Sequence, residues 1–219
     1  MEIAVPKGRL LAGVQDILKE AGIEMYRKSD RCYTFTTNVP GLTGMVVKPR
    51  AIPQLLALGS FDFGFCGRDL VWDSPHRLDL ASTLDLGLNP VRIVVAVHES
   101  QADILVNRPT RPVVIATEYE VIAAEWALER RLPAIIVNTY GSTEGYAPRK
   151  ADIVLDCVET GDTMRANGLV ILEDLFGSTT LTCTTIQKLC DPDVEDLNRR
   201  LQEAIRRLQS GPEVKQGDD

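Results

Sequence analysis

The chain has 219 residues, a formal net charge of −7 and a hydrophobic fraction of 44%. This length can bury a sizeable core in one large domain or two lobes, and the ordinary apolar fraction excludes a disordered chain. The negative charge argues against broad nucleic-acid binding. No apolar run approaches the roughly 20 residues that a membrane-spanning helix needs, so we expect no membrane segment.

The first ninety or so residues alternate between strand and helix patterns. Residues 2–5 predict a buried strand, and residues 9–23 show apolar side chains at helical spacing up to Gly22. Residues 42–48 predict a second strand, residues 49–60 a short helix that stops near Gly59, and residues 61–67 a third strand. The order β-α-β-α-β is typical of a parallel sheet covered by helices.

The next segment repeats this order. Strands are predicted at 91–97, 112–117, 133–138 and 151–158, a helix at 118–131, and a loop with a helix at 141–151. A Thr-rich strand is predicted at 178–187, followed by an amphipathic helix at 193–210. The apolar stripe of this helix is expected to be Val194, Leu197, Leu201, Ile205 and Leu208. Residues 211–219 are expected to be frayed.

Two β-α-β-α-β units predict an α/β protein with two α/β lobes and a cleft between them, organised like a type II periplasmic-binding protein. We expect lobe I to comprise residues 1–89 plus 179–219, with the last strand and helix returning to it. Lobe II is expected to comprise residues 90–178. Ligands of such proteins bind in the cleft and at the carboxyl ends of parallel strands.

The cysteines and histidines argue against disulfides and against a protein-held metal. The five cysteines are odd in number and contain no Cys-x-x-Cys pair, which is typical of reduced thiols. No signal-peptide pattern opens the sequence, so we expect a cytoplasmic protein. The two histidines are too few and too isolated for a zinc site, and no metal ligands are predicted among the side chains.

The segment "LDCVETGDTMRANGL", residues 155–169, predicts a binding loop between a strand and a helix. Gly161 lets the backbone approach a phosphate closely, while Thr160 and Thr163 offer hydroxyl donors next to a helix N-terminus. Asp156 and Glu159 are suited to accept hydrogen bonds from a ribose diol. The combination favours a sugar phosphate as ligand. The alternative is an ordinary helix start without a ligand, with Asp162 or Thr163 as the N-cap.

Basic residues gather near the turns of the first part of the chain. Residues 1–70 contain nine Lys and Arg and seven Asp and Glu, a balance of +2, so the remainder carries −9. The basic residues near turns are Lys7, Arg9, Arg31, Lys48, Arg50 and Arg68. They predict a local anion site on an acidic protein, with ordinary solvated surface charges as the alternative.

Five short motifs, taken in order along the chain, resemble one enzyme family. They are "VPKGRL" at residues 5–10, "FDFGFCGRD" at 61–69, "IATEY" at 115–119, "YGSTEGYAP" at 140–148 and the 155–169 loop. Together, from about Ile3 to Gly168, they resemble ATP phosphoribosyltransferase, the first enzyme of histidine biosynthesis. The length resembles the short form of the family, which lacks a C-terminal regulatory domain.

This resemblance implies a reaction and partners. N1 of the adenine of ATP attacks 5-phosphoribosyl 1-pyrophosphate, giving N1-(5-phosphoribosyl)-ATP and pyrophosphate, with Mg²⁺ carried on the pyrophosphate. The short form works with a regulatory subunit that resembles histidyl-tRNA synthetase, so the resemblance implies a homodimer within a larger hetero-oligomer. No nucleic-acid or membrane partner is expected.

The resemblance also implies roles for individual residues. The catalytic cations that hold the departing pyrophosphate are expected to be Lys7, Arg31 and Lys48. The phosphoribosyl-pyrophosphate ligands are expected to be Asp156, Glu159, Thr160, Gly161, Asp162 and Thr163. The ATP contacts are expected to be Arg9, Asp69 and Glu144, although Asp69 and Glu144 are also suited to be helix caps.

The sequence departs from the family pattern in three places. One extra residue separates Glu144 from Ala147, the segment after Pro148 is short and basic, and Lys48 aligns where short forms often carry an Arg. Two alternatives therefore stand beside the main hypothesis. One is a phosphoribosyltransferase that acts on a different base. The other is a cytosolic small-anion sensor with the same two-lobe fold.

Overall fold

The computed structural model describes residues 1–107 and 109–210, which form two units with one sheet each. Unit 1 comprises Met1–Val71, His76–Asn89 and the described chain from Thr180 onward. Unit 2 comprises Trp72–Pro75 and Pro90–Thr179. No helix in the described part is long and apolar enough to cross a membrane. The predicted fraying at 211–219 lies outside the described residues.

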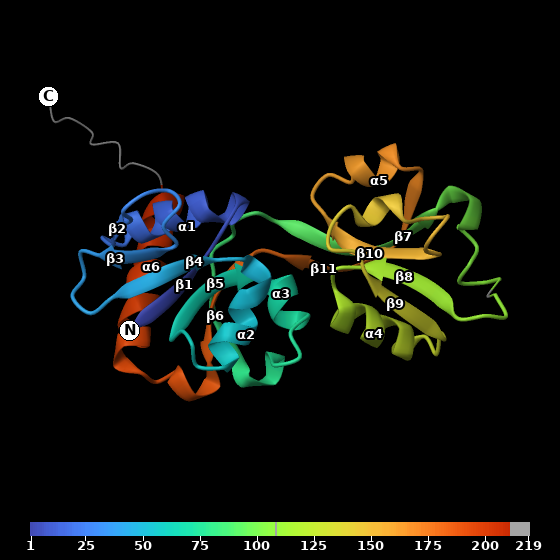
Figure 1. Cartoon of the computed structure of the whole chain (residues 1–219). Coiled ribbons are helices and arrows are strands. Elements are labelled where there is room, and N and C mark those ends of the chain that lie inside the picture. Colours follow the sequence, from blue (N-terminus) through green and yellow to red (C-terminus); the bar gives the residue numbers. More distant parts are fainter. Residues whose placement is uncertain (108, 211–219) are drawn as a thin grey trace, which may run out of the picture. The chain divides into compact units, whose positions relative to one another are not determined.

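Unit 1 contains a seven-stranded sheet in the order β2-β3-β4-β1-β5-β12-β6 (Figure 1). Its strands are β1 (Glu2–Pro6), β2 (Met25–Tyr26), β3 (Thr34–Thr37), β4 (Thr43–Val47), β5 (Phe63–Gly67), β6 (Leu80–Asp85) and β12 (Thr180–Thr185). The three central strands β4, β1 and β5 are parallel, as the β-α-β-α-β pattern predicts, and the other pairs are antiparallel. β12 lies between β5 and β6.

Helices cover both faces of this sheet. They are α1 (Arg9–Glu20), η1 (Pro49–Ala51), α2 (Ile52–Ala57), α3 (Arg68–Trp72), η2 (Arg77–Asp79), η5 (Ile186–Lys188) and α6 (Pro192–Ser210). Because successive side chains of a strand point to opposite faces, Ile3 and Val5 of β1 pack with α1 and α6, whereas Ala4 packs with α2. The result is a core on each side of the sheet.

The apolar stripe predicted for α6 is correct except at its last position. Val194, Leu197, Leu201 and Ile205 are buried, but Leu208 is 54% exposed. Leu208 lies in the last turn, beyond the part of the helix that packs against α1 and the sheet. Amphipathic spacing predicts which face of a helix is apolar, and it does not show where the underlying core ends.

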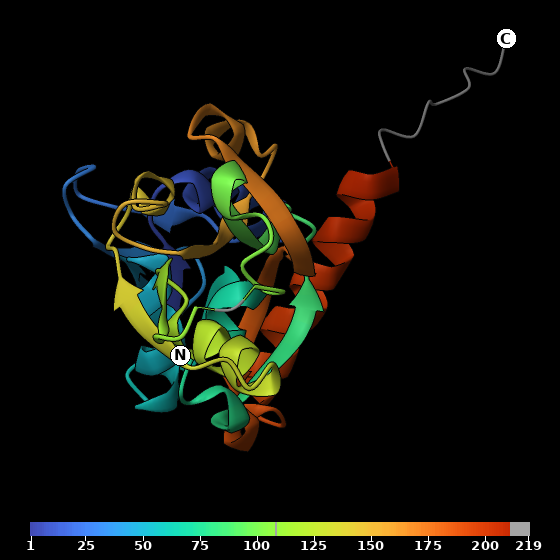
Figure 2. The ribbon, with the colours of Figure 1, turned by 90° about the vertical axis from the view of Figure 1, so that its right-hand side faces the viewer.

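Unit 2 contains a five-stranded sheet in the order β11-β7-β10-β8-β9, whose strands are labelled in Figure 1 and seen from another direction in Figure 2. Its strands are β7 (Val91–His98), β8 (Val113–Thr117), β9 (Ala134–Asn138), β10 (Ile153–Val158) and β11 (Leu169–Ser178). Its helices are η3 (Glu99–Gln101), α4 (Glu120–Glu129), η4 (Thr143–Gly145) and α5 (Asp162–Ala166). β10, β8 and β9 are parallel, whereas β7 runs antiparallel to both β10 and β11.

Several elements differ from the sequence predictions. Four strands, β2, β3, β6 and β11, were not predicted, because β2 is short and the others lack a clear alternation of buried and exposed residues. The helix expected within 141–151 is wrong, since this segment contains only the three-residue η4. Glycines at 141 and 145 and Pro148 disfavour a longer helix there.

The segment Trp72–Pro75 belongs to unit 2, although it lies in the range predicted for lobe I. The Trp72 ring lies on the Phe176 ring with centroids 4.4 Å apart. Asp73 Oδ1 accepts hydrogen bonds from the backbone N–H groups of Val121 (2.9 Å) and Ile122 (3.2 Å), so it caps the N-terminus of α4. Long-range contacts of this kind leave no local signal in the sequence.

Packing of α6 against α1 should contribute strongly to the stability of unit 1. Leu201 is fully buried in that core. We expect Leu201→Ala to lower the free energy of unfolding by about 2–5 kcal/mol, because it removes buried methyl groups and leaves a cavity. Leu208→Ala, on the same helix but exposed, should lower it by less than about 1 kcal/mol. Urea denaturation measures both, and equal losses would contradict this packing.

Candidate functional site

The carboxyl ends of the parallel strands of unit 1 bring basic residues to one edge of the sheet. Lys7 follows β1, Lys48 follows β4 and Arg68 follows β5. Pro6 lies opposite Val47 in the register, and the Lys7 backbone N–H donates to the Val47 carbonyl at 2.8 Å. The side chains of Lys7 and Lys48 are both exposed. This cationic edge consists of residues that are well separated in sequence.

Lys7 is oriented by Tyr33. Its Nζ donates a hydrogen bond to the Tyr33 hydroxyl at 3.1 Å and lies 4.9 Å from the centre of the Tyr33 ring. The Tyr33 carbonyl accepts a bond from the Val46 backbone N–H at 2.8 Å, which holds this loop beside β4. Arg31 is exposed two residues earlier. Sequence reasoning missed Tyr33, because nothing local distinguishes it from a surface tyrosine.

The residues predicted to contact ATP from unit 1 lie on the first turns of two helices. Arg9 begins α1 and is exposed. Asp69 lies in α3, is only 7% exposed and turns back over Gly67, where an added Cβ would lie 2.2 Å from Asp69 Oδ1. An added side chain at position 67 would therefore displace the Asp69 carboxylate. The neighbouring Arg68 pairs with Asp85 at 3.2 Å.

The carboxyl ends of the parallel strands of unit 2 form a second, acidic edge. β10 pairs with β8 so that Leu155 lies opposite Thr117, which places Asp156 and Glu118 one residue beyond that pair. The Thr143 hydroxyl hydrogen-bonds to Asp156 and lies 2.8 Å from the Thr139 hydroxyl. Glu144, in η4, completes this group. Glu118, Thr139 and Thr143 were not predicted as site residues.

Burial raises the pKa of the Asp156 carboxyl to about 6. Desolvation is the main cause, and the negative charges of Glu144 and Glu118 add to it. Hydrogen bonds from the Cys157 backbone N–H (2.7 Å to Oδ1) and from Thr143 act in the opposite direction. The Asp156 carboxyl is therefore ionised near neutral pH, although burial makes its charged form less stable than that of an exposed aspartate. Such a carboxylate is suited to accept hydrogen bonds from a neutral diol.

The predicted binding loop follows β10 and begins α5. Gly161 is the N-cap of α5, in a left-handed conformation with φ 79°, and no side chain caps the helix. The Thr160 hydroxyl donates to Asp162 Oδ2 at 2.6 Å and accepts from the Asp162 backbone N–H at 3.3 Å. Arg165 pairs with Asp162 and donates to the Thr160 carbonyl at 3.3 Å.

The structure corrects the N-cap predicted for this helix. The N-cap is Gly161, so neither Asp162 nor Thr163 caps the helix. The first N–H groups of a helix have no intrahelical partner. Glu159, Thr160 and Thr163 are exposed, and Thr163 lies in the first turn of α5. Two exposed threonines and the first turn of α5 thus follow Asp156 beyond the end of β10, where a phosphorylated sugar would find both donors and acceptors.

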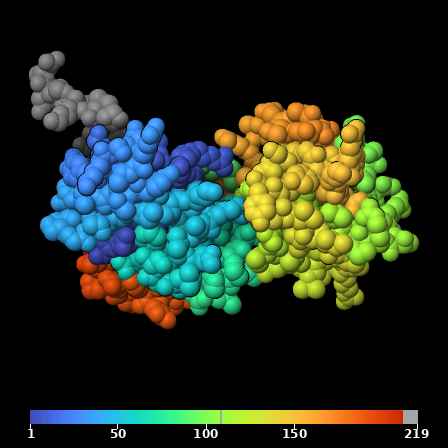
Figure 3. Space-filling view, viewed as in Figure 1, coloured from blue at the N-terminus to red at the C-terminus, as the bar shows by residue number. Residues whose placement is uncertain are grey.

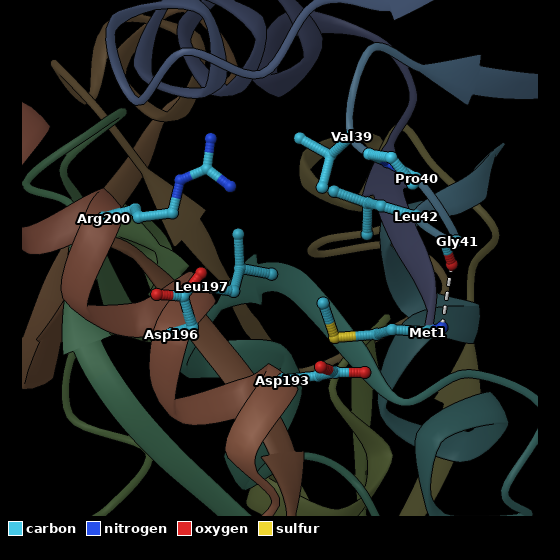
Figure 4. Close-up of a pocket in the computed structure, with 9 residues that line it drawn as sticks. All are labelled: Met1, Val39, Pro40, Gly41, Leu42, Asp193, Asp196, Leu197 and Arg200. Carbon is cyan, nitrogen blue, oxygen red and sulfur yellow. Dashed lines mark hydrogen bonds between the residues drawn. The ribbon is translucent and has the colours of Figure 1, made fainter.

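Two cavities lie at the opposite, amino edges of the sheets. In unit 1 a cavity of about 140 Å³ lies between the N-terminus and α6 (Figure 4). Met1 and Gly41 line it, with the terminal amine donating to the Gly41 carbonyl at 2.9 Å. In unit 2 a groove of about 350 Å³ is lined by Arg111, Arg149 and others. Neither contains a predicted site residue.

Protein side chains do not gather into a metal site in the described ranges. No group of three or more His, Cys, Asp or Glu residues there is close enough to hold an ion.

Comparisons with known proteins agree on one family. The family model described as HisG: ATP phosphoribosyltransferase matches residues 48–210. An ATP phosphoribosyltransferase from Caldanaerobacter subterraneus subsp. tengcongensis is 30% identical over 211 residues, covering 94% of this chain and 97% of that protein. The ATP phosphoribosyl transferase (HisG:HisZ) complex from Thermotoga maritima contains a chain with a TM-score of 0.80 and 26% identity, covering 94% of this chain and 98% of its own.

The fold has wider likenesses. A histidine kinase sensor domain with similarity to periplasmic binding proteins has a TM-score of 0.56 at 12% identity, covering 96% of this chain and 90% of its own. At this identity the likeness shows the fold alone. The predicted α/β class with a periplasmic-binding-protein-like organisation is confirmed.

The raised pKa of Asp156 should make stability depend on pH in a defined direction. Between about pH 4 and pH 6 the folded state keeps a proton that the unfolded state has lost, so stability falls as the pH rises through this window. Asp156→Asn does not titrate. The free energy of unfolding of this variant minus that of the original chain should therefore rise by at most about 3 kcal/mol from pH 4 to pH 7.

Urea denaturation at several pH values measures this difference, and Asp162→Asn is the matched control. The Thr160 hydroxyl and Arg165 lower the pKa of Asp162, so its stabilising effect is present above the unfolded pKa and lost as the pH falls. The two variants should thus show opposite pH trends relative to the original chain. If the difference in free energy of unfolding between Asp156→Asn and the original chain does not change with pH, this result contradicts the burial of the Asp156 carboxyl.

Proposed function

We propose that this chain, which belongs to the ATP phosphoribosyltransferase family, is the catalytic subunit that joins ATP to 5-phosphoribosyl 1-pyrophosphate. The products are N1-(5-phosphoribosyl)-ATP and pyrophosphate, in the first step of histidine biosynthesis. Beside the family match, the loop after β10 carries the proposal. Gly161 as an N-cap without a side-chain cap, with Thr160, Thr163 and Asp156 around it, offers what a ribose 5-phosphate needs.

We assign the binding of the phosphoribosyl group to unit 2. The backbone of Gly161 and the hydroxyl of Thr163 donate to the 5-phosphate, and the Thr160 hydroxyl turns from Asp162 to the phosphate when the substrate binds, because a phosphate monoester accepts several hydrogen bonds at once. Asp156 and Glu159 accept hydrogen bonds from the ribose hydroxyls. Asp162 stays paired with Arg165 and orders the loop. We assign residues 90–178 to this lobe.

We assign the stabilisation of the departing pyrophosphate to unit 1. Lys7, Lys48 and Arg31 place positive charge where the leaving group gathers negative charge as the C1–oxygen bond breaks. The developing ribosyl cation needs mainly positioning and charge stabilisation. Adenine N1 carries a free lone pair, so no base has to activate it. Arg9, Asp69 and Glu144 are assigned to ATP. This lobe is unit 1, which comprises Met1–Val71, His76–Asn89 and the described chain from Thr180 onward.

Mg²⁺ is assigned to the pyrophosphate of the substrate, where it neutralises phosphate charge. The HisG:HisZ complex from Thermotoga maritima contains two kinds of subunit. By similarity, this chain works with a second subunit of the HisZ kind. In the short form of the family this regulatory subunit resembles histidyl-tRNA synthetase. We assign the enzyme to the cytoplasm, where its substrates are made.

An assay with ATP, phosphoribosyl pyrophosphate and Mg²⁺, with and without the second subunit, tests the proposal. We expect pyrophosphate release and a phosphoribosyl-ATP product. Thr163→Val should raise the KM or Kd for phosphoribosyl pyrophosphate roughly tenfold, because one hydrogen bond to a charged phosphate is lost. Thr36→Val, an exposed threonine of β3, is the matched control. No pyrophosphate release under either condition would contradict the proposal.

The outcome also separates the alternatives. Release of pyrophosphate with another nitrogen base but not with ATP would indicate a phosphoribosyltransferase that transfers the phosphoribosyl group to a different base. Tight binding of a simple oxyanion without turnover would indicate a sensor. Calorimetric titration with and without Mg²⁺ distinguishes the two, because only a pyrophosphate substrate should need the cation.

Lys7 should affect turnover more than binding, and Tyr33 should act through it. We expect Lys7→Met to lower kcat by roughly 100-fold, since a cation at the leaving group is lost. Tyr33→Phe keeps the ring under the ammonium but removes the hydroxyl, whereas Tyr33→Leu removes both.

The ordering of the effects is the test. The kcat loss should increase from Tyr33→Phe to Tyr33→Leu to Lys7→Met, with a smaller change in KM. Adding either Tyr33 change to Lys7→Met should cause little further loss, because the tyrosine then has no ammonium to orient. Additive losses in the double variants would show that Tyr33 does not act through Lys7.

A further inference from the structure

Three consecutive residues after strand β9 have a left-handed backbone. They are Tyr140 (φ 53°), Gly141 (φ 115°) and Ser142 (φ 52°), and together we call them the strained turn. Glycine adopts this conformation readily, whereas a residue with a Cβ atom does so at a cost in free energy. Strain of this kind persists where the surrounding structure holds it, and it gathers at ligand-binding positions.

The strained turn lies at the carboxyl edge of the unit 2 sheet. β9 ends at Asn138, which lies opposite Thr117 at the end of β8, and the Thr139 backbone N–H donates to the Thr117 carbonyl at 3.1 Å. On its other side β8 pairs with β10, the strand that carries Asp156. In Figure 3 the yellow segment that contains β9 and the following connection lies at the surface of unit 2. The turn is thus at the same edge as the proposed ribose site.

Side-chain contacts hold the strained turn at both of its ends. Asn138 Oδ1 accepts a hydrogen bond from the Tyr140 backbone N–H at 3.0 Å, while the Asn138 amide group donates to Glu120 of α4. The hydroxyls of Thr139 and Thr143, the residues on either side of the turn, lie 2.8 Å apart, and both residues are buried. The backbone at Tyr140 is therefore held from both directions.

The same hydroxyl pair connects the turn to Asp156. The Thr143 hydroxyl hydrogen-bonds to the Asp156 carboxylate, which is ionised near neutral pH and can then only accept. The Thr143 proton is used in that bond, so the Thr139 hydroxyl is the donor within the pair. The strained turn and the carboxylate that we assign to the ribose thus share one buried support.

The Tyr140 side chain is exposed although its backbone is fixed. It is 87% exposed, so its ring adds little packing energy to the fold that could offset the strain. A tyrosine ring presents a large flat surface and has few rotatable bonds, so ordering it on binding costs little entropy. A fixed backbone lowers this cost further. The ring is therefore suited to contact a ligand.

The charges around Tyr140 indicate which ligand its ring can contact. Glu118 follows β8, and Glu144 lies in η4, two residues after the turn. Glu120 is tied to the end of β9 by the hydrogen bond described above. These carboxylates disfavour an anionic ring, whereas a neutral nucleobase presents a π face that stacks on tyrosine. Glu144 is also among the residues that we assign to ATP.

The proposed reaction favours contact with the face of the base. Adenine N1 attacks through a lone pair that lies in the plane of the ring. A hydrogen bond to N1 would occupy this lone pair, because N1 has only one. A stack on the face of the ring fixes the position of the base and leaves the lone pair free for the attack.

We propose that the Tyr140 ring stacks on the adenine of ATP, and that the Thr139–Thr143 hydroxyl pair holds the strained turn for this contact. Tyr140 is then a specificity residue, and Thr139 is a positioning residue. The resemblance assigns a role to neither of them. This inference rests on the proposed function and adds a contact with the base to it.

Calorimetric titration and steady-state kinetics of the full chain, together with the second subunit, test the stack. Tyr140→Ala should raise the Kd and the KM for ATP about tenfold, because a stack between a base and an aromatic ring is lost. The KM for phosphoribosyl pyrophosphate should stay within about twofold of the original value. Tyr140→Phe keeps the ring and should bind ATP as the original chain does. Tyr26→Ala is the matched control, since Tyr26 is 51% exposed on β2 of unit 1.

Inorganic tripolyphosphate has the phosphates of ATP without its base, so it isolates the contact with adenine. Tyr140→Ala should leave the Kd for tripolyphosphate unchanged. Both Kd values are measured without turnover, so they decide on Tyr140 even if the chain transfers no phosphoribosyl group. An unchanged Kd for ATP would overturn the stack, and so would an equal loss of tripolyphosphate affinity. Weaker binding of the second subunit with an unchanged Kd for ATP would assign Tyr140 to that partner and also overturn it.

Thr139 variants test the hydroxyl pair. Thr139→Val removes the donor and should raise the KM for ATP about threefold with little change in kcat, whereas Thr139→Ser keeps the hydroxyl and should restore the original value. In the Tyr140→Ala background, Thr139→Val should cause no further rise, because the turn then has no ring to position. Thermal unfolding checks that each variant is folded. A KM for ATP that Thr139→Val leaves unchanged, or a further rise in the double variant, would show that the pair does not act through Tyr140.

Discussion

Parallel strand pairing is the constraint on which both candidate edges depend. In a parallel sheet the carboxyl ends of neighbouring strands lie together. Strand pairing alone therefore brings residues that are far apart in sequence close to one another. The β1–β4 register brings Lys7 beside Lys48, and the β8–β10 register brings Glu118 beside Asp156. Slipping either register would scatter these groups, because every strand-end residue would move with it.

The two edges differ in charge, and this difference matches the parts of the proposed substrate. The unit 1 edge presents exposed cations, which favour a leaving group that gathers charge as it departs. The unit 2 edge presents hydroxyls, backbone donors and a carboxylate whose pKa is raised by burial. Such an edge binds best a ligand that brings both acceptors and hydroxyl donors, as a phosphorylated ribose does. A bare anion would meet Asp156, Glu144 and Glu118 unfavourably.

The sequence predicted the parallel strands well, because strands buried on both faces appear as short apolar runs with breaks at their ends. It also predicted that Lys7, Lys48 and the 155–169 loop follow the carboxyl ends of such strands, and the structure places them there, while their roles stay predictions. It could not predict β11, whose two register shifts disturb the alternation, or Tyr33, whose importance comes from reaching Lys7 across the sheet. Tertiary contacts determine these features, and no local pattern records them.

Asp73 explains why the loop of α5, rather than the longer α4, serves as the proposed phosphate site. Both helices begin at the carboxyl edge of unit 2, after β10 and β8. α4 has ten residues and offers the greater set of aligned peptide dipoles. However, the Asp73 carboxylate already accepts from Val121 and Ile122 in its first turn. A second anion there would meet a negative charge and find its donors taken. At α5 the N-cap Gly161 has no side chain, and only the neutral Thr160 hydroxyl accepts from the first turn, at the Asp162 N–H. The protein thus satisfies the N-terminus of α4 with its own carboxylate, whereas in our proposal the N-terminus of α5 binds the phosphate of the substrate.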